Sequence, residues 1–346
     1  MSRNLISLSV AAVLLGGTAL ADVPNVAVDI APVHSLVARV MQGVGEPTLI
    51  VAPGASPHEY SLRPSEAAAL QEADLVFWVS PDLTPWLEGA IETLAGDAVV
   101  TELLELDGVS ELPLRESALF EAHAHEEDDH GADDHDDHDD HDDEEHADGD
   151  DHDHAEDEHA HDDDDHEHDD HAGHDHGEHD PHAWLSPDNA AVWLNAIAAK
   201  LSAVDPDNAG AYFANAAAGR EELAALSGEI NAILEPVRGR NFIVFHDAYQ
   251  YFETAFDFPA SGAISVSDAS APSPARIAEI QARVTDQRVS CVLSEPQFNP
   301  GIVAAVMEGS EASTGILDPL GSDLEPGPEL YANMLRNLAT TLADCL

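Results

Sequence analysis

Four histidines of this chain stand apart from the rest and could do metal chemistry. All but four of the 21 histidines fall between residues 121 and 180, and those that remain are His34, His58, His182 and His246. An imidazole supplies a nitrogen donor, and three of them with one further ligand or a water suit Zn²⁺, which is tetrahedral in proteins. Manganese and magnesium prefer more oxygen donors. The residue types therefore favour zinc over a harder cation.

Three of these histidines occupy positions where binding sites usually form. His58 lies in a turn rich in Gly and Pro after a predicted strand, His182 precedes a predicted helix, and His246 follows a predicted strand. Ligands of open α/β sheets bind beyond the carboxyl ends of strands, and loops on a rigid scaffold carry function. We expect these three rings to meet between two domains, and we assign His34 a structural role.

Acidic residues beside the histidines could hold each ring in one tautomer. Glu59 follows His58 and Asp247 follows His246, so we expect both acids to accept hydrogen bonds from the imidazoles. Glu295 follows another predicted strand. Two roles are open to it: a place near the same cleft, or a local hydrogen bond at the end of its strand.

Strand-like runs alternate with helical runs on both sides of the His-rich stretch, which predicts parallel sheets covered on both faces. The predicted strands are residues 25–30, 48–51, 74–79, 241–245, 263–266, 290–294 and 314–317. The predicted helices are residues 33–44, 64–72, 86–94, 187–204, 208–234, 274–284, 300–307 and 330–342. We therefore expect an α/β fold with two lobes, each a parallel sheet flanked by helices, joined by a long helix.

The chain of 346 residues is long enough for two domains. We expect an N-terminal α/β lobe over residues 22–205, which includes the His-rich stretch. A linking helix over residues 206–235 then leads to a C-terminal α/β lobe over residues 236–346.

Residues 1–21 match a secretory signal peptide. Arg3 precedes an apolar run over residues 5–20, which ends in Ala19-Leu20-Ala21, the small-x-small pattern that a signal peptidase cuts. The run is short for a membrane span, which needs about 20 apolar residues. We expect an exported protein, cleaved after Ala21.

Cys291 and Cys345 are the two cysteines of the chain. An isolated pair in an oxidising compartment usually forms a disulfide, worth about 4 kcal/mol by loop entropy. A metal site on the two thiolates is the alternative. It lacks a neighbouring His or further Cys at ligand spacing.

Residues 121–180 contain no Lys, Arg, Leu, Ile, Val, Phe, Tyr or Trp, so they cannot bury a core that offsets the entropy of ordering. We expect a disordered loop. His-rich tracts bind metals, and the loop could raise the local concentration of zinc near His182; alternatively it is a solubilising spacer. Its candidate accessory ligands are His135, His138, His141, His174, His176 and His179.

The formal net charge of −57 at pH 7 limits the kinds of molecule that the chain can bind. Phosphate binding needs clustered Lys and Arg, and the chain has 12 such residues in total. The charge therefore argues against nucleic acid and points to cations.

Six motifs spread over the chain resemble those of one known family. They are Gly54-Ala-Ser-Pro-His-Glu-Tyr-Ser-Leu-Arg-Pro-Ser-Glu, Ala73-Asp-Leu-Val-Phe-Trp-Val, His182-Ala-Trp-Leu-Ser-Pro, Val244-Phe-His-Asp-Ala-Tyr, Ser294-Glu-Pro-Gln-Phe and Leu317-Asp-Pro-Leu-Gly. In these motifs the chain resembles the periplasmic zinc-binding proteins of bacterial zinc ABC importers, the ZnuA type within a cluster of metal-binding proteins.

The resemblance implies that His58, His182 and His246 ligate zinc, since manganese-binding relatives have a carboxylate where His246 stands. Some relatives have a carboxylate immediately before the first ligand, where this chain has Pro57. The fourth ligand is therefore open between Asp318 and a water. The family also implies a long loop rich in His and acids at this place, and some of its zinc-binding members have a cysteine pair like this one.

The function that the resemblance implies is binding and delivery. A monomeric periplasmic protein would capture Zn²⁺ and deliver it to the membrane permease of an ABC importer, which has a cytoplasmic ATPase, with no enzymatic step. A zinc buffer or metallochaperone without a permease is one alternative. A zinc enzyme is another, because three histidines and a water can also activate that water; the sequence has neither H-E-x-x-H nor G-x-S-x-G.

Overall fold

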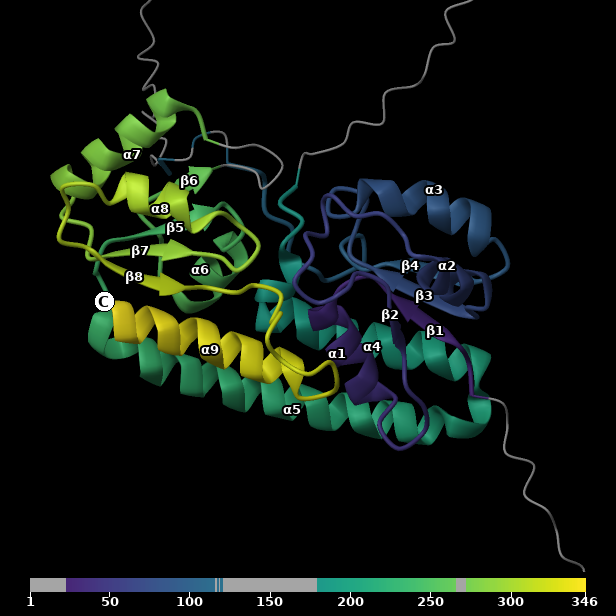
Figure 1. Ribbon diagram of the computed structural model, residues 1–346. Helices are drawn as coiled ribbons and strands as arrows, with labels where there is room; N and C mark the ends of the chain where they lie inside the picture. The colour runs from purple at the N-terminus through teal and green to yellow at the C-terminus, as the bar shows by residue number, and fades with distance from the viewer. Residues whose placement is uncertain (1–22, 116, 118, 121–178, 266–271) are drawn as a thin grey trace, which may run out of the picture. The chain divides into compact units, whose positions relative to one another are not determined.

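The computed structural model describes residues 23–115, 117, 119–120, 179–265 and 272–346 (Figure 1). Its strands form two parallel four-stranded sheets with the orders β2-β1-β3-β4 and β6-β5-β7-β8. The first sheet contains β1 (Val26–Val28), β2 (Thr48–Leu49), β3 (Leu75–Trp78) and β4 (Val99–Glu102). The second contains β5 (Phe242–His246), β6 (Ala263–Ser265), β7 (Cys291–Ser294) and β8 (Ser313–Ile316). Each sheet with its helices is a lobe, so the expected two-lobed α/β fold is confirmed.

The helices of the described chain follow the predicted ones closely. They are α1 (Ala31–Val40), α2 (Pro64–Gln71), α3 (Pro85–Leu94), α4 (Pro187–Val204), α5 (Ala209–Leu234), α6 (Gln250–Phe256), α7 (Pro274–Asp286), α8 (Pro300–Val306) and α9 (Leu330–Cys345). The sequence pattern predicts neither β4 nor α6. β4 exposes Val99 and Val100, and α6 is too short for a helical period to be recognised.

Alternate residues of each strand face opposite layers of helices, as the pleat of a strand requires. In the first lobe, Val76 and Trp78 pack with α2 and α3, whereas Leu75 and Phe77 pack with α1 and α4. In the second lobe, one face of β5 packs with α7 and α8, and the other packs with α6 and α9. Burial on both faces explains the nearly continuous apolar runs of these strands.

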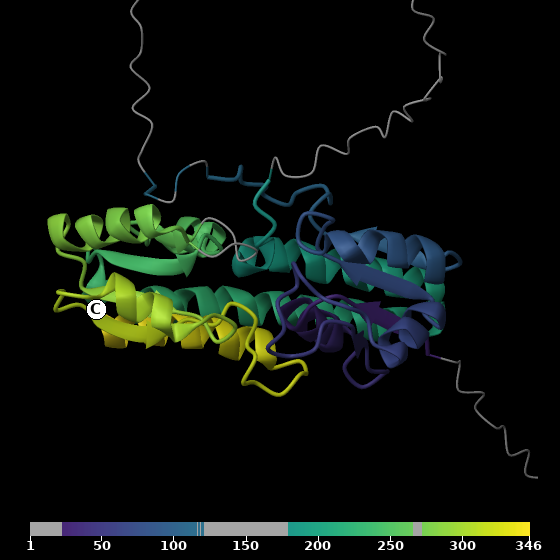
Figure 2. The same cartoon turned by 45° about the horizontal axis from the view of Figure 1, so that its top comes forward.

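One apolar core continues from the first lobe into the second. Its members include Phe77 of the first sheet, Trp193 of α4, Leu226 of α5 and Leu293 of the second sheet. α5 packs against α1, α4 and α9, and Figures 1 and 2 show it running past both sheets. The predicted disulfide Cys291–Cys345 ties the end of α9 to the start of β7.

Two predictions concern residues outside the described part of the chain. These are the signal peptide over residues 1–21 and the disordered loop, of which the structure describes only residues 179 and 180. Among the described helices, none combines the length and the apolar character that a membrane span requires.

Asp29 joins the two central strands of the first sheet. It follows β1 and is fully buried, and its carboxylate accepts hydrogen bonds from the backbone N–H groups of Ile30 at 2.7 Å and Val79 at 2.8 Å. Val79 follows β3, so the carboxylate holds the carboxyl ends of neighbouring strands together.

Substitution of Asp29 by Ala should lower the free energy of unfolding by about 2–5 kcal/mol, because it leaves two buried N–H groups without acceptors. Asp74→Ala is the matched control. The Asp74 carboxylate also accepts a backbone N–H, from Asn25 at 2.8 Å, but at an exposed position, so its loss should cost about 1 kcal/mol or less. Denaturant unfolding of both variants measures the difference, and equal losses would contradict this role of Asp29.

Candidate metal centre

The structure brings three of the predicted site residues together. The candidate ligand atoms of His58, His182 and His246 all lie within 4.8 Å of one another, and no other such group of His, Cys, Asp or Glu occurs among the described residues. The ring centroid of His182 lies 5.5 Å from that of His58 and 5.3 Å from that of His246. Nitrogens at this spacing can converge on one ion with little movement.

His58 is presented by the loop between β2 and α2. The loop turns at Gly54, whose φ of +78° favours glycine. Trp86 of α3 donates its indole N–H to the carbonyl of Pro57 at 2.7 Å, and its ring contacts the ring of Tyr60. This single loop supplies the ligand of the first lobe, and His58 is only half-buried.

His182 is buried at the start of the 3₁₀ turn η1 (Ala183–Leu185), directly before α4. Asp180 holds it twice, since one carboxylate oxygen lies 2.7 Å from the ring Nδ1 and accepts the backbone N–H of His182 at 2.9 Å. Trp184 donates its indole N–H to the carbonyl of Pro319 in the second lobe at 2.8 Å. His182 is therefore anchored by contacts to the second lobe as well as by α4.

His246 is placed by the register of the second sheet. It is the last residue of β5, and β5 pairs with β7 so that Phe242 lies opposite Cys291. The same offset places Glu295, which follows β7, beside His246, and the carboxylate lies 2.6 Å from the ring Nδ1. β5 and β7 are also the strands between which the chain order of the sheet reverses. Open α/β sheets bind ligands at this switch point.

The acids that hold the rings differ from those expected. The roles predicted for Glu59 and Asp247 are filled at His182 and His246 by Asp180 and Glu295. Asp247 instead pairs with Arg115 at 3.0 Å, because successive residues along an extended chain point to opposite sides. Glu59 is exposed. The sequence signals for the true partners were the His-Asp-Pro-His motif for Asp180 and the end of a neighbouring strand for Glu295.

Asp318, the candidate fourth ligand, is not in the group. Its carboxylate accepts hydrogen bonds from the backbone N–H groups of Leu320, Gly321 and Ser322 and from the Ser322 hydroxyl, at 2.6–3.0 Å. These bonds close the turn after β8. The next residues, Pro319 and Leu320, line the cavity at the three histidines.

The other predicted histidines lie elsewhere. His34 is buried in α1, and its Nε2 lies 3.0 Å from the carbonyl of Pro47. His179 lies with its Nδ1 3.5 Å from the carboxylate of Glu111, outside the group of three. The remaining accessory candidates fall outside the described residues: His135, His138, His141, His174 and His176.

The histidine group fits a small metal ion with nitrogen ligands. The cavity between the rings has a volume of about 10 Å³, close to that of one water-sized sphere. Carboxylates at Nδ1 of His182 and His246 orient each ring so that Nε2 serves as the ligand atom, the arrangement common around zinc. Three imidazoles leave one tetrahedral position for a water or another ligand.

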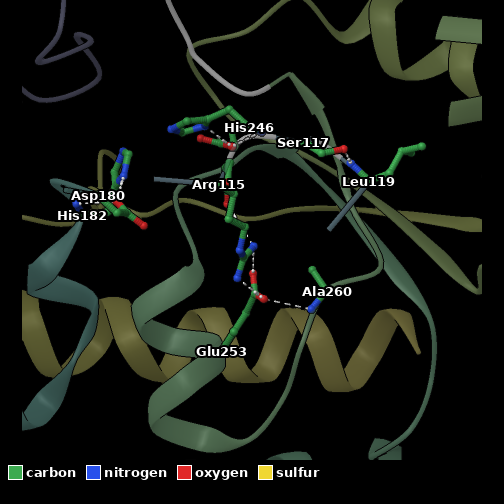
Figure 3. Close-up of polar contacts among 10 residues, drawn as sticks. Arg115, Ser117, Leu119, Asp180, His182, His246, Glu253 and Ala260 are labelled. Atoms are coloured by element: carbon green, nitrogen blue, oxygen red, sulfur yellow. Dashed lines mark hydrogen bonds and ion pairs between the residues drawn. The ribbon is translucent and has the colours of Figure 1, made fainter. Parts of the chain in front are cut away.

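Buried acids lie close to this group, and Figure 3 labels two of them, Asp180 and Glu253. Asp180, Asp247, Glu253 and Glu295 are all buried, and burial raises the pKa of both Asp180 and Asp247 to about 7, against the opposing charge of Arg115. A bound divalent cation would favour the ionised forms of these carboxylates. The environment therefore favours a cation electrostatically.

Substitution of Glu295 by Gln should weaken zinc binding by about tenfold, because the carboxylate that orients His246 loses its charge. Glu59→Gln should leave the affinity unchanged, since Glu59 is exposed. Titration against a competing chelator measures both dissociation constants. If the two substitutions weakened zinc binding equally, Glu295 would have no special role in orienting His246.

Comparison with known proteins places this chain in a family. The family model described as "Zinc-uptake complex component A periplasmic" matches residues 26–345. The high-affinity zinc uptake system protein ZnuA of Brucella abortus (strain 2308) is 45% identical over 348 residues, 99% of each chain. The protein of the same name from Paracoccus denitrificans (strain Pd 1222) is 46% identical over 341 residues, 97% of each chain.

A solved structure supports the fold independently. The structure described as "Crystal structure of ZnuA" superposes with a TM-score of 0.68 at 22% identity, over 94% of this chain and 99% of that one. Because the family model and both relatives span nearly the whole sequence, this chain belongs to the family of periplasmic A components of zinc-uptake complexes.

Proposed function

We propose that this chain captures Zn²⁺ in the periplasm and delivers it to the membrane permease of an ABC importer with a cytoplasmic ATPase. The convergence of three imidazoles within 4.8 Å carries the proposal. The relatives named as zinc uptake proteins support it. The chain acts as a monomer, and zinc is cargo that leaves chemically unchanged.

In this proposal a water completes the coordination of zinc by His58, His182 and His246. Asp318 is a poor fourth ligand because its carboxylate already accepts four hydrogen bonds within its own turn. Moving it onto the metal would leave those donors without an acceptor, at about 1–3 kcal/mol for each buried group. A coordinated water also leaves a position that a permease ligand can take.

Release would begin at His58. His182 and His246 are both buried and held by carboxylates, whereas His58 comes from a loop of the first lobe and is half-buried. The continuous core through α4, α5 and α9 opposes separation of the lobes. Movement of the His58 loop alone would reduce the site to two imidazoles and weaken it.

Two other functions are compatible with three histidines and a water. A zinc buffer would bind the ion equally well but would not support permease-dependent uptake, so complementation of a zinc-limited strain lacking its own binding protein separates the two. A zinc hydratase or hydrolase would use the bound water as a nucleophile. Assays of CO₂ hydration and ester hydrolysis with the zinc-loaded chain test that role.

Substitution of His246 by Ala should weaken zinc binding by roughly a hundredfold, a few kcal/mol, because one of three protein ligands is lost. His34→Ala is the control, since His34 is a buried histidine outside the group. Calorimetry with a competing chelator measures both. If His246→Ala binds zinc as tightly as the unaltered chain, the proposed site is wrong.

Deletion of residues 121–178 should lower the number of zinc ions bound and keep one tight site. The accessory role of the His-rich loop is part of this proposal. The sequence predicts a disordered loop, and ligands that must be ordered on binding lose entropy, so its sites should be weaker. The deletion keeps His179, which pairs with Pro113, and Asp180, which contacts His182. Loss of the tight site on deletion would instead make the loop the main zinc site.

A further inference from the structure

Residues 110–115 cross from the first lobe to the second beside the metal centre. At one end, the backbone N–H and carbonyl of Ser110 bond to the side chain of Asn189 in α4 at 2.8 and 3.0 Å. Further along, the N–H of Leu112 donates to the hydroxyl of Tyr251 in α6 at 3.0 Å. We call residues 110–115 the crossing segment.

The crossing segment is paired with the residues that lead to His182. The N–H of Asp180 donates to the carbonyl of Leu112 at 2.7 Å, and Pro113 and His179 form an antiparallel bridge. The Tyr251 hydroxyl donates to the carbonyl of Asp180 at 3.0 Å. Because Asp180 holds the ring of His182, the position of this ligand depends on how the crossing segment is seated.

Arg115 seats the segment on the second lobe. Its guanidinium lies 2.8 Å from the carboxylate of Glu253 in α6 and 3.0 Å from that of Asp247, the residue after ligand His246. A second nitrogen–oxygen contact of 3.3 Å makes the pair with Glu253 bidentate. Figure 3 shows Arg115 between the histidine ligands and Glu253. Both carboxylates are at least nine-tenths buried, and the side chain of Arg115 is 20% exposed.

We propose that Arg115 is a positioning residue of the zinc site, which fixes His182 beside His246 by locking the crossing segment onto Asp247 and Glu253. The chain of contacts is continuous: Arg115 holds the segment, the segment holds Asp180, and Asp180 holds the ring of His182. His58 stands on a different loop, where Trp86 donates to the carbonyl of Pro57. This inference rests on the proposed zinc-binding function.

The direction of the change in zinc affinity when Arg115 is removed distinguishes a positioning role from simple charge repulsion. Arg115 is a cation close to a site for a cation, so its removal would strengthen zinc binding if Coulomb repulsion were its main contribution. Removal of a positioning residue instead weakens binding, typically by 10–100-fold for groups that orient metal ligands. The two accounts therefore predict opposite signs for the same substitution.

The test measures zinc dissociation constants and dissociation rates of the full-length chain and its variants with a competing chelator. Arg115→Met should weaken binding by at least about tenfold, chiefly through faster dissociation. Arg115→Lys should lie between Met and Arg, because one ammonium cannot reproduce the bidentate fork. Arg39→Met is the matched control: Arg39 makes a bidentate pair with Glu222 of α5, away from the histidines, and its loss should leave zinc binding unchanged.

Double-mutant cycles identify the ligand that Arg115 positions. Arg115→Met should add little to the loss caused by His182→Ala, whereas it should still cause a clear further loss in a chain that carries His58→Ala. If Arg115→Met fails to fold by circular dichroism, Glu253→Gln and Arg115→Lys take its place and should both weaken binding. Unchanged or tighter binding in these variants, or equal coupling to His58 and His182, overturns the proposal. Absence of tight zinc binding in the unaltered chain would instead refute the proposed function.

Discussion

A single apolar core passes through both lobes, and the convergence of the three histidines depends on it. The core joins the faces of both sheets that pack on α1, α4, α5 and α9. Protein interiors are packed as densely as organic crystals, so such a core transmits displacement instead of absorbing it. The end of β5 and the start of α4, which present His246 and His182, therefore hold fixed positions relative to each other.

The centre combines this rigidity with a cluster of buried carboxyl groups. Four carboxylates are buried around the site, and Arg115 is the guanidinium that pairs with two of them. Burying a charge without a partner is costly. A bound divalent cation would compensate the charge of the ionised carboxylates. By mass action, a cation that binds only the folded chain also stabilises it. In the proposed function, metal capture and folding stability would be coupled through the same carboxylates.

The three ligands differ in how they are held, and this difference matters for delivery. Two rings are buried beside carboxylates in packed structure, and the third is half-buried on a loop whose contacts include the indole hydrogen bond of Trp86. A carrier must bind its cargo tightly and still release it. A site with two rigid ligands and one on a loop meets both demands without opening the shared core.

The amino-acid sequence by itself determined the α/β class, the two lobes and most of the helices, because apolar periodicity and Pro or Gly signals are local. It also singled out His58, His182 and His246, since composition isolates the whole His-rich stretch from the few other histidines. The disulfide followed from a cysteine pair without competitors. The sequence pattern did not predict edge strand β4 and the short helix α6, because neither shows a clear period of apolar residues.

Tertiary structure alone decided which groups touch. Glu295 meets His246 because of the register of β5 against β7, and Asp180 holds His182 because the chain folds back over two residues. Asp247 follows His246 in sequence but pairs with Arg115, Glu59 is exposed, and Asp318 accepts hydrogen bonds within its own turn. The same holds for Arg115, which reaches α6 from a segment far away in the chain. Pairing across strands and lobes depends on register and packing, which no local pattern of residues encodes.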